Sequence, residues 1–320
     1  MSTRSPVLFL VFNRPDTTQR VFDAIRAAQP PRLYVAADGP RAARAGEAER
    51  CEAVRRIATA VDWPCELVTL LRTENMGCKM AVSAAITWFF EHEPEGIILE
   101  DDCLPDPSFF GYCDALLERY RDDDRVMCVS GDNFIAPHWQ PDHSYYFSRY
   151  AHIWGWASWA RAWKHYEVDL NAESGESIEA VLARTFPAES SLRAHWYGVL
   201  LDVAMGRIDT WDYQWTYALM RRGGLSCVPC SNLISNVGFG PGATHTIGPE
   251  SRLAGLPIAG LNLPMVHPSQ VHRADKADTW IERGVFEIPA RTPLRRSLKN
   301  LLRRLQRAAT RTQLARSAAQ

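Results

Sequence analysis

The sequence predicts an α/β protein built on a mostly parallel central sheet with helices on its faces. Short apolar runs alternate with longer amphipathic segments over residues 1–130, a pattern typical of parallel strands joined by crossover helices. With 46% hydrophobic residues among 320, the chain can bury a large core. Acidic residues also follow two of the apolar runs directly, and open α/β sheets bind ligands at the carboxyl ends of their strands.

The first elements alternate regularly along the chain. The continuous apolar run PVLFLVF (6–12) predicts a buried strand. The amphipathic segment 16–28 predicts the helix that follows this strand. RLYVAAD (32–38) predicts a second strand, because Asp38, Gly39 and Pro40 then form a turn. Segment 44–61 carries charges on one face, which favours an exposed helix.

The pattern continues to the end of the first half. We expect a third strand at CELVTLLR (65–72), a helix at 80–92, a fourth strand at GIILE (96–100) and a fifth at RVMCVSG (125–131). Asp38 and the acidic run 100–102 both lie at the carboxyl ends of predicted strands, where open α/β sheets bind ligands.

Aromatic residues dominate the second half of the chain. Residues 145–166 hold nine aromatic side chains, WDYQWTY follows at 211–217, and a glycine-rich loop covers 236–246. We therefore expect the chain to divide into segments 1–132 and 133–250, followed by a C-terminal extension at 251–290 and a basic tail at 291–320.

Charge and cysteine content narrow the class of protein. The formal net charge of −1 gives no reason to expect nucleic-acid binding. Only Cys227 and Cys230 have metal-like spacing, and one such pair indicates free thiols more than zinc. With neither a signal peptide nor an apolar span of about 20 residues in view, we expect a soluble cytoplasmic protein.

The tail adds a further expectation about membranes. From Arg291 on, nine basic residues occur without an acid, and leucines repeat on one helical face. Such a basic amphipathic helix over 291–316 indicates peripheral contact with the inner membrane face. A basic helix packed on its own domain, or lying in solvent, explains the pattern as well.

The stretch GIILEDDCLPDP (96–107) is the clearest chemical signal. Adjacent carboxylates raise one another's pKa unless a positive charge lies between them. Mg²⁺ and Mn²⁺ prefer oxygen ligands, and Mg²⁺ is often held by one or two carboxylates together with substrate phosphates. Glu100, Asp101 and Asp102 therefore predict a metal that bridges to a phosphorylated substrate. The alternative is an exposed acidic turn before a helix that starts near Pro107, with Asp106 as its N-cap.

These residues resemble a known family. EDDCLPDPSFFGYC looks like the metal motif of GT-A glycosyltransferases, most closely that of N-acetylglucosaminyltransferase I and similar bacterial family 2-like proteins. Further segments match in the same order between residues 5 and 245: VFNRPD, AADGP, CKMAVSAAITWFF, RVMCVSGDN, GWASWARAW and TWDYQW.

The resemblance implies that 1–132 is the nucleotide-sugar-binding half of a GT-A domain and 133–250 the acceptor-binding and catalytic half. The reaction that it implies is an inverting transfer that depends on Mn²⁺ or Mg²⁺. This transfer moves a sugar, N-acetylglucosamine from its UDP donor as first expectation, to a hydroxyl of a glycan or a lipid-linked acceptor.

By resemblance Asp102 is the metal ligand, and Glu100 and Asp101 lie near the sugar and ribose. Asp212 matches the family's catalytic base, while Tyr213 stands where a second aspartate is expected, which puts acceptor contacts in doubt. As a bare feature, Asp212 also suits a helix N-cap.

Other candidate contacts are less specific. Arg14 and Lys79 are candidate phosphate-binding cations, or ordinary surface side chains. Asp38 is the candidate acceptor for a base N–H, or it satisfies its own turn. Trp156 is the aromatic residue that we expect to stack on a sugar.

The glycine-rich loop supplies three more candidates. Glycines allow close backbone approach to a ligand, so Ser235 and Thr244 are expected near the diphosphate and His245 as a second metal ligand. A surface loop with an incidental histidine is the alternative.

Three other functions remain open. A nucleotidyltransferase that forms nucleotide-sugars would show a glycine-rich loop after the first strand, where this chain has NRPDTT. A receiver-like pocket of Asp101, Asp102 and Lys79 would place its acid pair after the first strand. A non-catalytic sugar-binding module would bind ligand without turnover.

Overall fold

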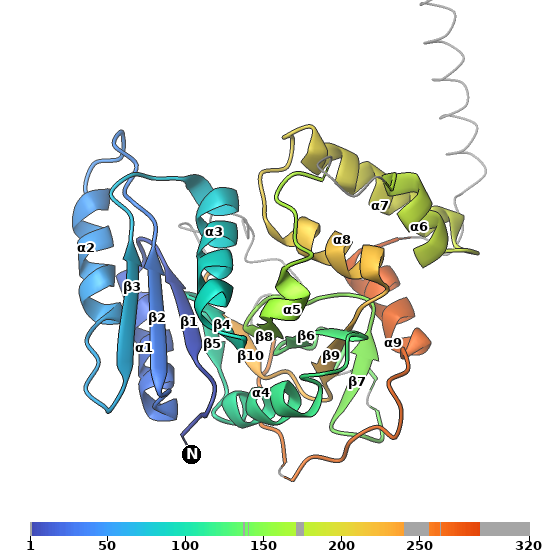
Figure 1. The fold of residues 1–320 in the computed structure, drawn as a ribbon, viewed down its shortest axis with the longest axis horizontal. Helices are drawn as coiled ribbons and strands as arrows, with labels where there is room; N and C mark the ends of the chain where they lie inside the picture. The colour runs from blue at the N-terminus through green and yellow to red at the C-terminus, as the bar shows by residue number, and fades with distance from the viewer. Residues whose placement is uncertain are drawn as a thin grey trace, which may run out of the picture.

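The central feature of the fold is one eight-stranded sheet. The computed structural model describes residues 2–136, 138–139, 141–170, 176–239, 256–262 and 264–288. The strands lie in the order β3-β2-β1-β4-β8-β6-β9-β7 (Figure 1). Their bounds are β1 Val7–Val11, β2 Arg32–Ala37, β3 Glu66–Leu71, β4 Glu95–Glu100, β6 Val126–Ser130, β7 Tyr145–Ser148, β8 Trp156–Trp159 and β9 Leu225–Pro229.

Six of these strands run in one direction. β1 pairs in parallel with β2 and β4, β2 with β3, and β6 with β9. β8 is antiparallel to both neighbours, β4 and β6, and β7 is antiparallel to β9. The carboxyl ends of β1, β2, β3, β4 and β6 therefore lie along one edge, where ligands of α/β sheets bind.

Helices cover both faces of the sheet. Their bounds are α1 Pro15–Ala28, α2 Glu47–Ala58, α3 Gly77–His92, α4 Ser108–Arg119, α5 Ala160–Trp163, α6 Ile178–Thr185, α7 Ser190–Ala204, α8 Asp212–Arg222 and α9 Asp275–Trp280, and the π-helix η1 follows at Ile281–Val285. One core cluster joins α1, α2 and α4 to the sheet, and the other joins α3, α5 and α8 to the opposite face. Alternate side chains of β1 enter the two clusters, as the pleat of a strand requires.

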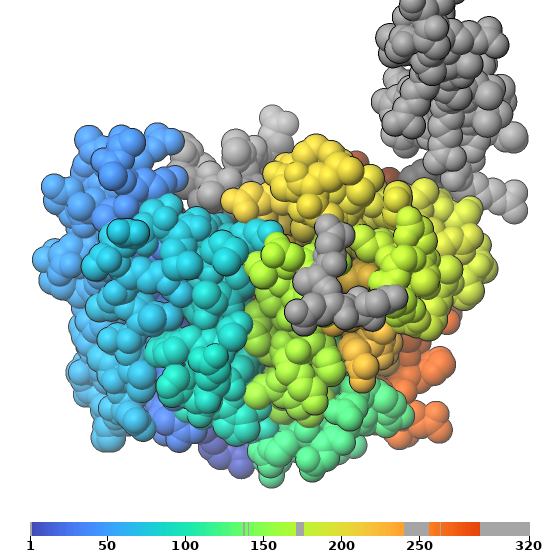
Figure 2. Space-filling model, turned by 45° about the horizontal axis from the view of Figure 1, so that its top comes forward, coloured from blue at the N-terminus to red at the C-terminus, as the bar shows by residue number. Residues whose placement is uncertain are grey.

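A third core cluster lies away from α1 and α2. It contains buried residues of α6, α7 and α9, and its helices lie beside α8 in Figure 1. Figure 2 shows the blue-to-cyan N-terminal segments and the green-to-yellow segments meeting along one boundary. The second half of the chain also contributes β7, β8 and β9 to the sheet, so the two halves share one sheet.

A small two-stranded sheet shapes the ligand-binding edge. β5 (Cys103–Pro105) pairs with β10 (Ile234–Asn236), with Asn236 opposite Cys103. Close packing under β10 depends on glycine, because a Cβ at Gly131 or Gly155 would lie within 3.0 Å of the Ile234 side chain. The chain after β10 is thereby held against the turn that carries Asp102.

The α/β class and all five predicted strands are confirmed. Helix α3 begins at Gly77, earlier than the expected residue 80, and α2 is shorter than 44–61. The strand β8 was not expected inside the aromatic segment. No helix within the described ranges has the length and apolar content to cross a bilayer, and the predicted basic helix at 291–316 lies outside them.

Candidate active site

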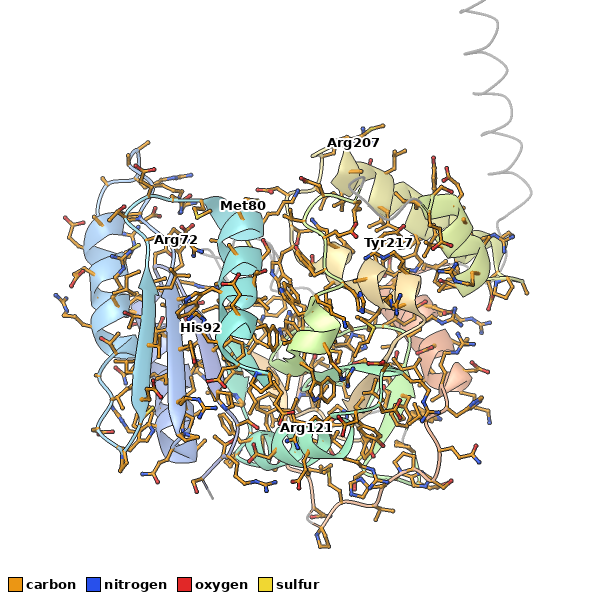
Figure 3. The ribbon with its side chains drawn as sticks, viewed as in Figure 1. Arg72, Met80, His92, Arg121, Arg207 and Tyr217 are labelled. Atoms are coloured by element: carbon orange, nitrogen blue, oxygen red, sulfur yellow. The ribbon has the colours of Figure 1, made fainter. Side chains whose placement is uncertain are left out.

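A pocket of about 360 Å³ opens at the carboxyl edge of the sheet. It lies beside the loops after β1, β2, β3 and β4 and is closed on the far side by the start of α8. Its polar lining residues are Asn13, Arg14, Asp38, Arg41, Arg72, Asn75, Glu100, Asp101, Asp102, Thr210, Asp212 and Asn236. Figure 3 places Arg72, at the end of β3, and Met80, in the first turns of α3, toward the same edge of the molecule.

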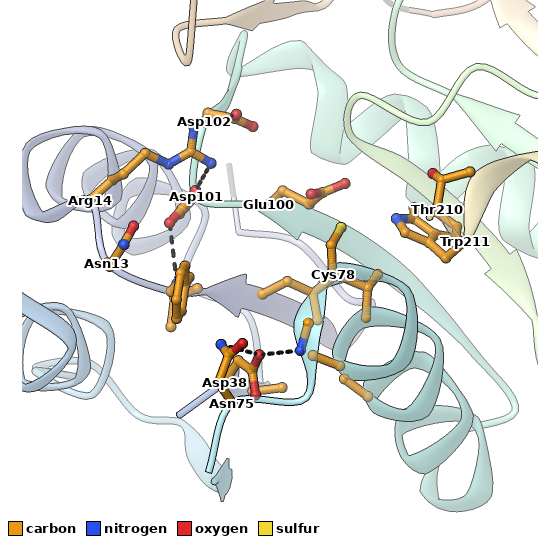
Figure 4. A pocket seen from close by; sticks show the side chains of 18 of the residues that line it. Asn13, Arg14, Asp38, Asn75, Cys78, Glu100, Asp101, Asp102, Thr210 and Trp211 are labelled. Carbon is orange, nitrogen blue, oxygen red and sulfur yellow. Dashed lines mark hydrogen bonds and ion pairs between the residues drawn. The ribbon is translucent and has the colours of Figure 1, made fainter. Parts of the chain in front are cut away.

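Asp38 ties the end of β2 to the start of α3. Its carboxylate accepts hydrogen bonds from the backbone N–H of Met76 and Gly77, at 3.0 and 3.2 Å, and from the Asn75 amide at 2.9 Å (Figure 4). These donors include N–H groups that a helix start leaves without intrahelical partners. Asp38, which directly follows β2, therefore caps the start of α3. An N–H of a nucleotide base would have to share carboxylate oxygens that already accept these bonds.

The acidic run turns sharply at the end of β4. Asp101 accepts a hydrogen bond from the Phe12 N–H at 3.2 Å, and its other oxygen lies 2.5 Å from Arg14 Nη2. Asp102 Oδ2 lies 2.9 Å from Arg14 Nη1. One guanidinium thus bridges the two aspartates, as Figure 4 shows. Arg14 lines the pocket, where its partners are these two carboxylates, and phosphate binding by Arg14 stays a prediction.

Glu100, the partly exposed last residue of β4, has no such partner. Within the described residues, no hydrogen bond or ion pair reaches its carboxylate. Burial and the charges of Asp102 and Asp101 raise the pKa of Glu100 to about 8. Burial also raises the pKa of Asp101 to about 6, although the Arg14 charge opposes the shift. The cluster therefore has more negative charge than Arg14 neutralises.

The donor set fits a divalent cation only in part. Glu100 and Asp102 offer carboxylate oxygens at the pocket wall, and such hard ligands suit Mg²⁺ or Mn²⁺. In the portion of the chain that the structure describes, no three His, Cys, Asp or Glu side chains group to hold a metal ion. A cation there would need further ligands from phosphate or water.

Asp212 is the first residue of α8 and lines the same pocket, and its neighbours Thr210 and Trp211 lie across the pocket from Arg14 in Figure 4. Thr210 donates a hydrogen bond to one of its oxygens, and the other is free of described partners. Trp211, buried beside it, stacks on Trp156 and fixes the start of the helix. The negative charge of Asp212 contributes to the raised pKa of Glu100, so the two carboxylates act on one pocket.

Trp156 corrects one expectation. Its side chain is fully buried and packs on Trp163, Trp211 and Trp215, so it offers no face to a sugar. Trp154, two residues earlier, lines the pocket instead, and its ring contacts Phe134 and Phe239 edge-on. A turn at Gly155 separates the two rings.

Two other residues predicted to contact the ligand, Lys79 and Ser235, do not line the pocket. Lys79 pairs with Asp169 at 3.5 Å and does not line the cavity. Ser235 lies within β10 opposite Leu104, and its neighbour Asn236 is the lining residue. Thr244 and His245 lie outside the described residues.

Several lining residues were not expected. Phe12 and Arg72 directly follow β1 and β3, so the strand-end rule that singled out Asp38 would have included them. Arg41 lies 5.4 Å over the Phe12 ring. Asn75 carried no sequence signal, because its role depends on the bond to Asp38.

Comparison with known proteins gives only distant structural similarity. No protein-family model and no curated protein sequence matches the chain. A crystal structure of UDP-glucose pyrophosphorylase complexed with UDP-glucose is 8% identical and covers 71% of this chain and 90% of its own, with a TM-score of 0.36. The apo form of mouse xyloside xylosyltransferase 1 is 10% identical and covers 68% and 81%, with a TM-score of 0.32. Similarity at this level assigns neither a family nor a function.

Proposed function

We propose that this protein is a metal-dependent inverting glycosyltransferase that uses a nucleotide diphosphate sugar. The observation that carries the proposal is the arrangement of one pocket: the acids 100–102 and Arg14 line it together with Asp212, and the two residues before Asp212, Thr210 and Trp211, lie across from Arg14 in Figure 4. The order of motifs along the chain, described above, favours the same reaction.

The acids 100–102 and Arg14 suit the donor. A divalent cation at Asp102 and Glu100 would stabilise the negative charge of the diphosphate as the sugar leaves. Arg14 and Arg72 provide positive charge at the same edge of the sheet, and the apolar residues Ala81, Val82 and Ala85 of α3 form a wall for the rest of the nucleotide.

Asp212 suits the acceptor. Inversion requires attack by a hydroxyl from the side opposite the leaving diphosphate. The bond from the anomeric carbon to the diphosphate breaks, the bond to the acceptor oxygen forms, and the hydroxyl proton passes to Asp212. Thr210 fixes one oxygen of Asp212 and leaves the other for the proton.

The details of the substrates are part of the proposal. UDP-N-acetylglucosamine is the first donor to test, Mn²⁺ or Mg²⁺ the cation, and a glycan or lipid-linked hydroxyl the acceptor. Membrane contact through 291–316 stays a prediction.

The test is thermal stability with UDP, GDP, dTDP and CMP sugars, each with and without Mn²⁺. A ligand that binds only the folded state raises the melting temperature by mass action. We expect a metal-dependent shift for one nucleotide class. Asp102→Asn should lose the metal-dependent part of the shift, whereas Asp212→Asn should keep the shift and lose transfer.

Three outcomes would overturn the proposal. A folded protein that shifts with no donor does not bind nucleotide-sugars. Binding without transfer or donor hydrolysis indicates a non-catalytic module. Release of pyrophosphate from a nucleoside triphosphate and a sugar phosphate indicates a nucleotidyltransferase.

A further inference from the structure

The bridge between Arg14 and the two aspartates has a consequence for metal binding. Arg14 contacts Asp101 and Asp102 with separate nitrogens, and the side chains of these aspartates are 3% and 12% exposed. Buried carboxylates need a positive partner, and within the described residues Arg14 is the only cation paired with them. In this arrangement, the guanidinium occupies the place that a cation would take.

The ion pair between Arg14 and Asp102 is closely packed on the side of β10. A Cβ on Gly238 would lie 2.2 Å from Asp102 Oδ2 and 2.7 Å from Arg14 Nη1. The Val237 N–H donates to the Asp102 carbonyl at 2.8 Å and holds this backbone in place. Backbone therefore covers the ion pair from the β10 side.

We propose that Arg14 and a divalent cation compete for Asp102, and that the released guanidinium binds the diphosphate. Mg²⁺ bonds to oxygen at about 2.0–2.1 Å, so a cation and the guanidinium on one oxygen would repel each other strongly. A diphosphate offers Arg14 new anionic partners in exchange for Asp102. Metal and nucleotide then bind cooperatively, since each makes room for the other.

This inference rests on the proposed function for the cation at Asp102 and for the diphosphate as second ligand. By linkage, UDP must strengthen Mn²⁺ binding by the same factor by which Mn²⁺ strengthens UDP binding. Removal of the Arg14 charge should raise affinity for Mn²⁺ alone, because the aspartates lose their internal partner. A residue that only binds phosphate would have no such effect.

The experiment is calorimetric titration of the full chain with MnCl₂, first alone and then with saturating UDP. We compare the parent protein with Arg14→Gln and with Arg26→Gln, an arginine of α1 that pairs with Asp23 and Asp62 and does not line the pocket. We expect Arg14→Gln to bind Mn²⁺ alone about tenfold more tightly than the parent, and to lose most of the strengthening by UDP. Arg26→Gln should match the parent in the titration with Mn²⁺ alone.

The outcomes separate the inference from the function. Unchanged or weaker Mn²⁺ binding by folded Arg14→Gln overturns the inference, even if the parent binds UDP and Mn²⁺ together. If the parent binds no UDP while Arg14→Gln gains Mn²⁺ affinity, the competition for Asp102 is supported, whereas the diphosphate-binding part of the inference is overturned together with the proposed function. If circular dichroism shows that Arg14→Gln does not fold, Arg14→Lys replaces it. That variant keeps the charge but loses the bidentate fork, so a smaller gain in Mn²⁺ affinity is expected, and no gain overturns the inference.

Discussion

Trp211 stacks on Trp156, with ring centroids 5.8 Å apart and an interplanar angle of 21°. Trp156 belongs to the central sheet, and Trp211 immediately precedes Asp212. The aromatic core therefore sets the position of the proposed base. Trp156, which the sequence suggested as a sugar contact, instead supports the start of the helix that carries Asp212.

Trp156→Ala is expected to destabilise the fold. The side chain is fully buried, and truncation of a buried Trp costs about 3–5 kcal/mol in the free energy of unfolding. Urea unfolding followed by circular dichroism measures the loss. A change below 1 kcal/mol, on the order of a surface substitution, would contradict the packing described here.

Trp154→Ala should act on ligand binding instead. Its ring lines the pocket and is only partly buried, so the proposed function predicts weaker binding of UDP-N-acetylglucosamine by at least about fivefold, which is near 1 kcal/mol. UDP lacks the sugar and serves as the control ligand, with affinity unchanged. Equal weakening of both ligands would show that the ring does not contact the sugar.

Asp38→Ala should loosen the start of α3. The variant leaves the N–H groups of Met76 and Gly77 without their acceptor, which costs about 1–3 kcal/mol in the free energy of unfolding. Hydrogen exchange should become faster at the first turn of α3. Asp38→Asn keeps one acceptor oxygen, so its exchange rate at the first turn of α3 should lie between those of the parent and of Asp38→Ala. Unchanged exchange in Asp38→Ala would refute the capping role.

Asp278 should make stability depend on pH. Its carboxylate is buried, accepts a 2.6 Å bond from Ser148, and faces Arg149 and Arg273 at 3.3 and 3.8 Å. Tyr146 and Glu282 also lie close enough for their titration to respond to its charge. Burial raises the pKa of Asp278 to about 6 even so.

The sign follows from this shift. Between pH 4 and 6 the folded state holds a proton that the unfolded state releases, so stability falls as pH rises through this window. Relative to Asp278→Asn, the parent should lose up to about 3 kcal/mol between pH 4 and pH 7. Urea unfolding of both proteins at pH 4, 5.5 and 7 measures the difference. If the parent instead gains stability relative to Asp278→Asn as the pH rises, the arginines stabilise the charged form and the prediction is wrong.

The sequence alone determined the alternation of strands and helices in the first half. Buried parallel strands are continuous apolar runs, so 7–11, 32–37 and 95–100 are visible without tertiary information. The strand-end rule then brought Asp38 and the acids 100–102 to one edge, because parallel strands share their carboxyl ends.

Tertiary structure alone decided the rest. β8 enters the sheet between β4 and β6 because both neighbours offer it hydrogen-bonding edges, and no local pattern records that pairing. Trp154 and Trp156 are indistinguishable as residue types. Packing against Trp211 and Trp215 of another segment buries one, while the turn at Gly155 leaves the other at the pocket. Similarly, Arg14 contacts Asp102 only because β1 and β4 are neighbours in the sheet. The two residues are 88 positions apart in the sequence, so local sequence does not encode their contact.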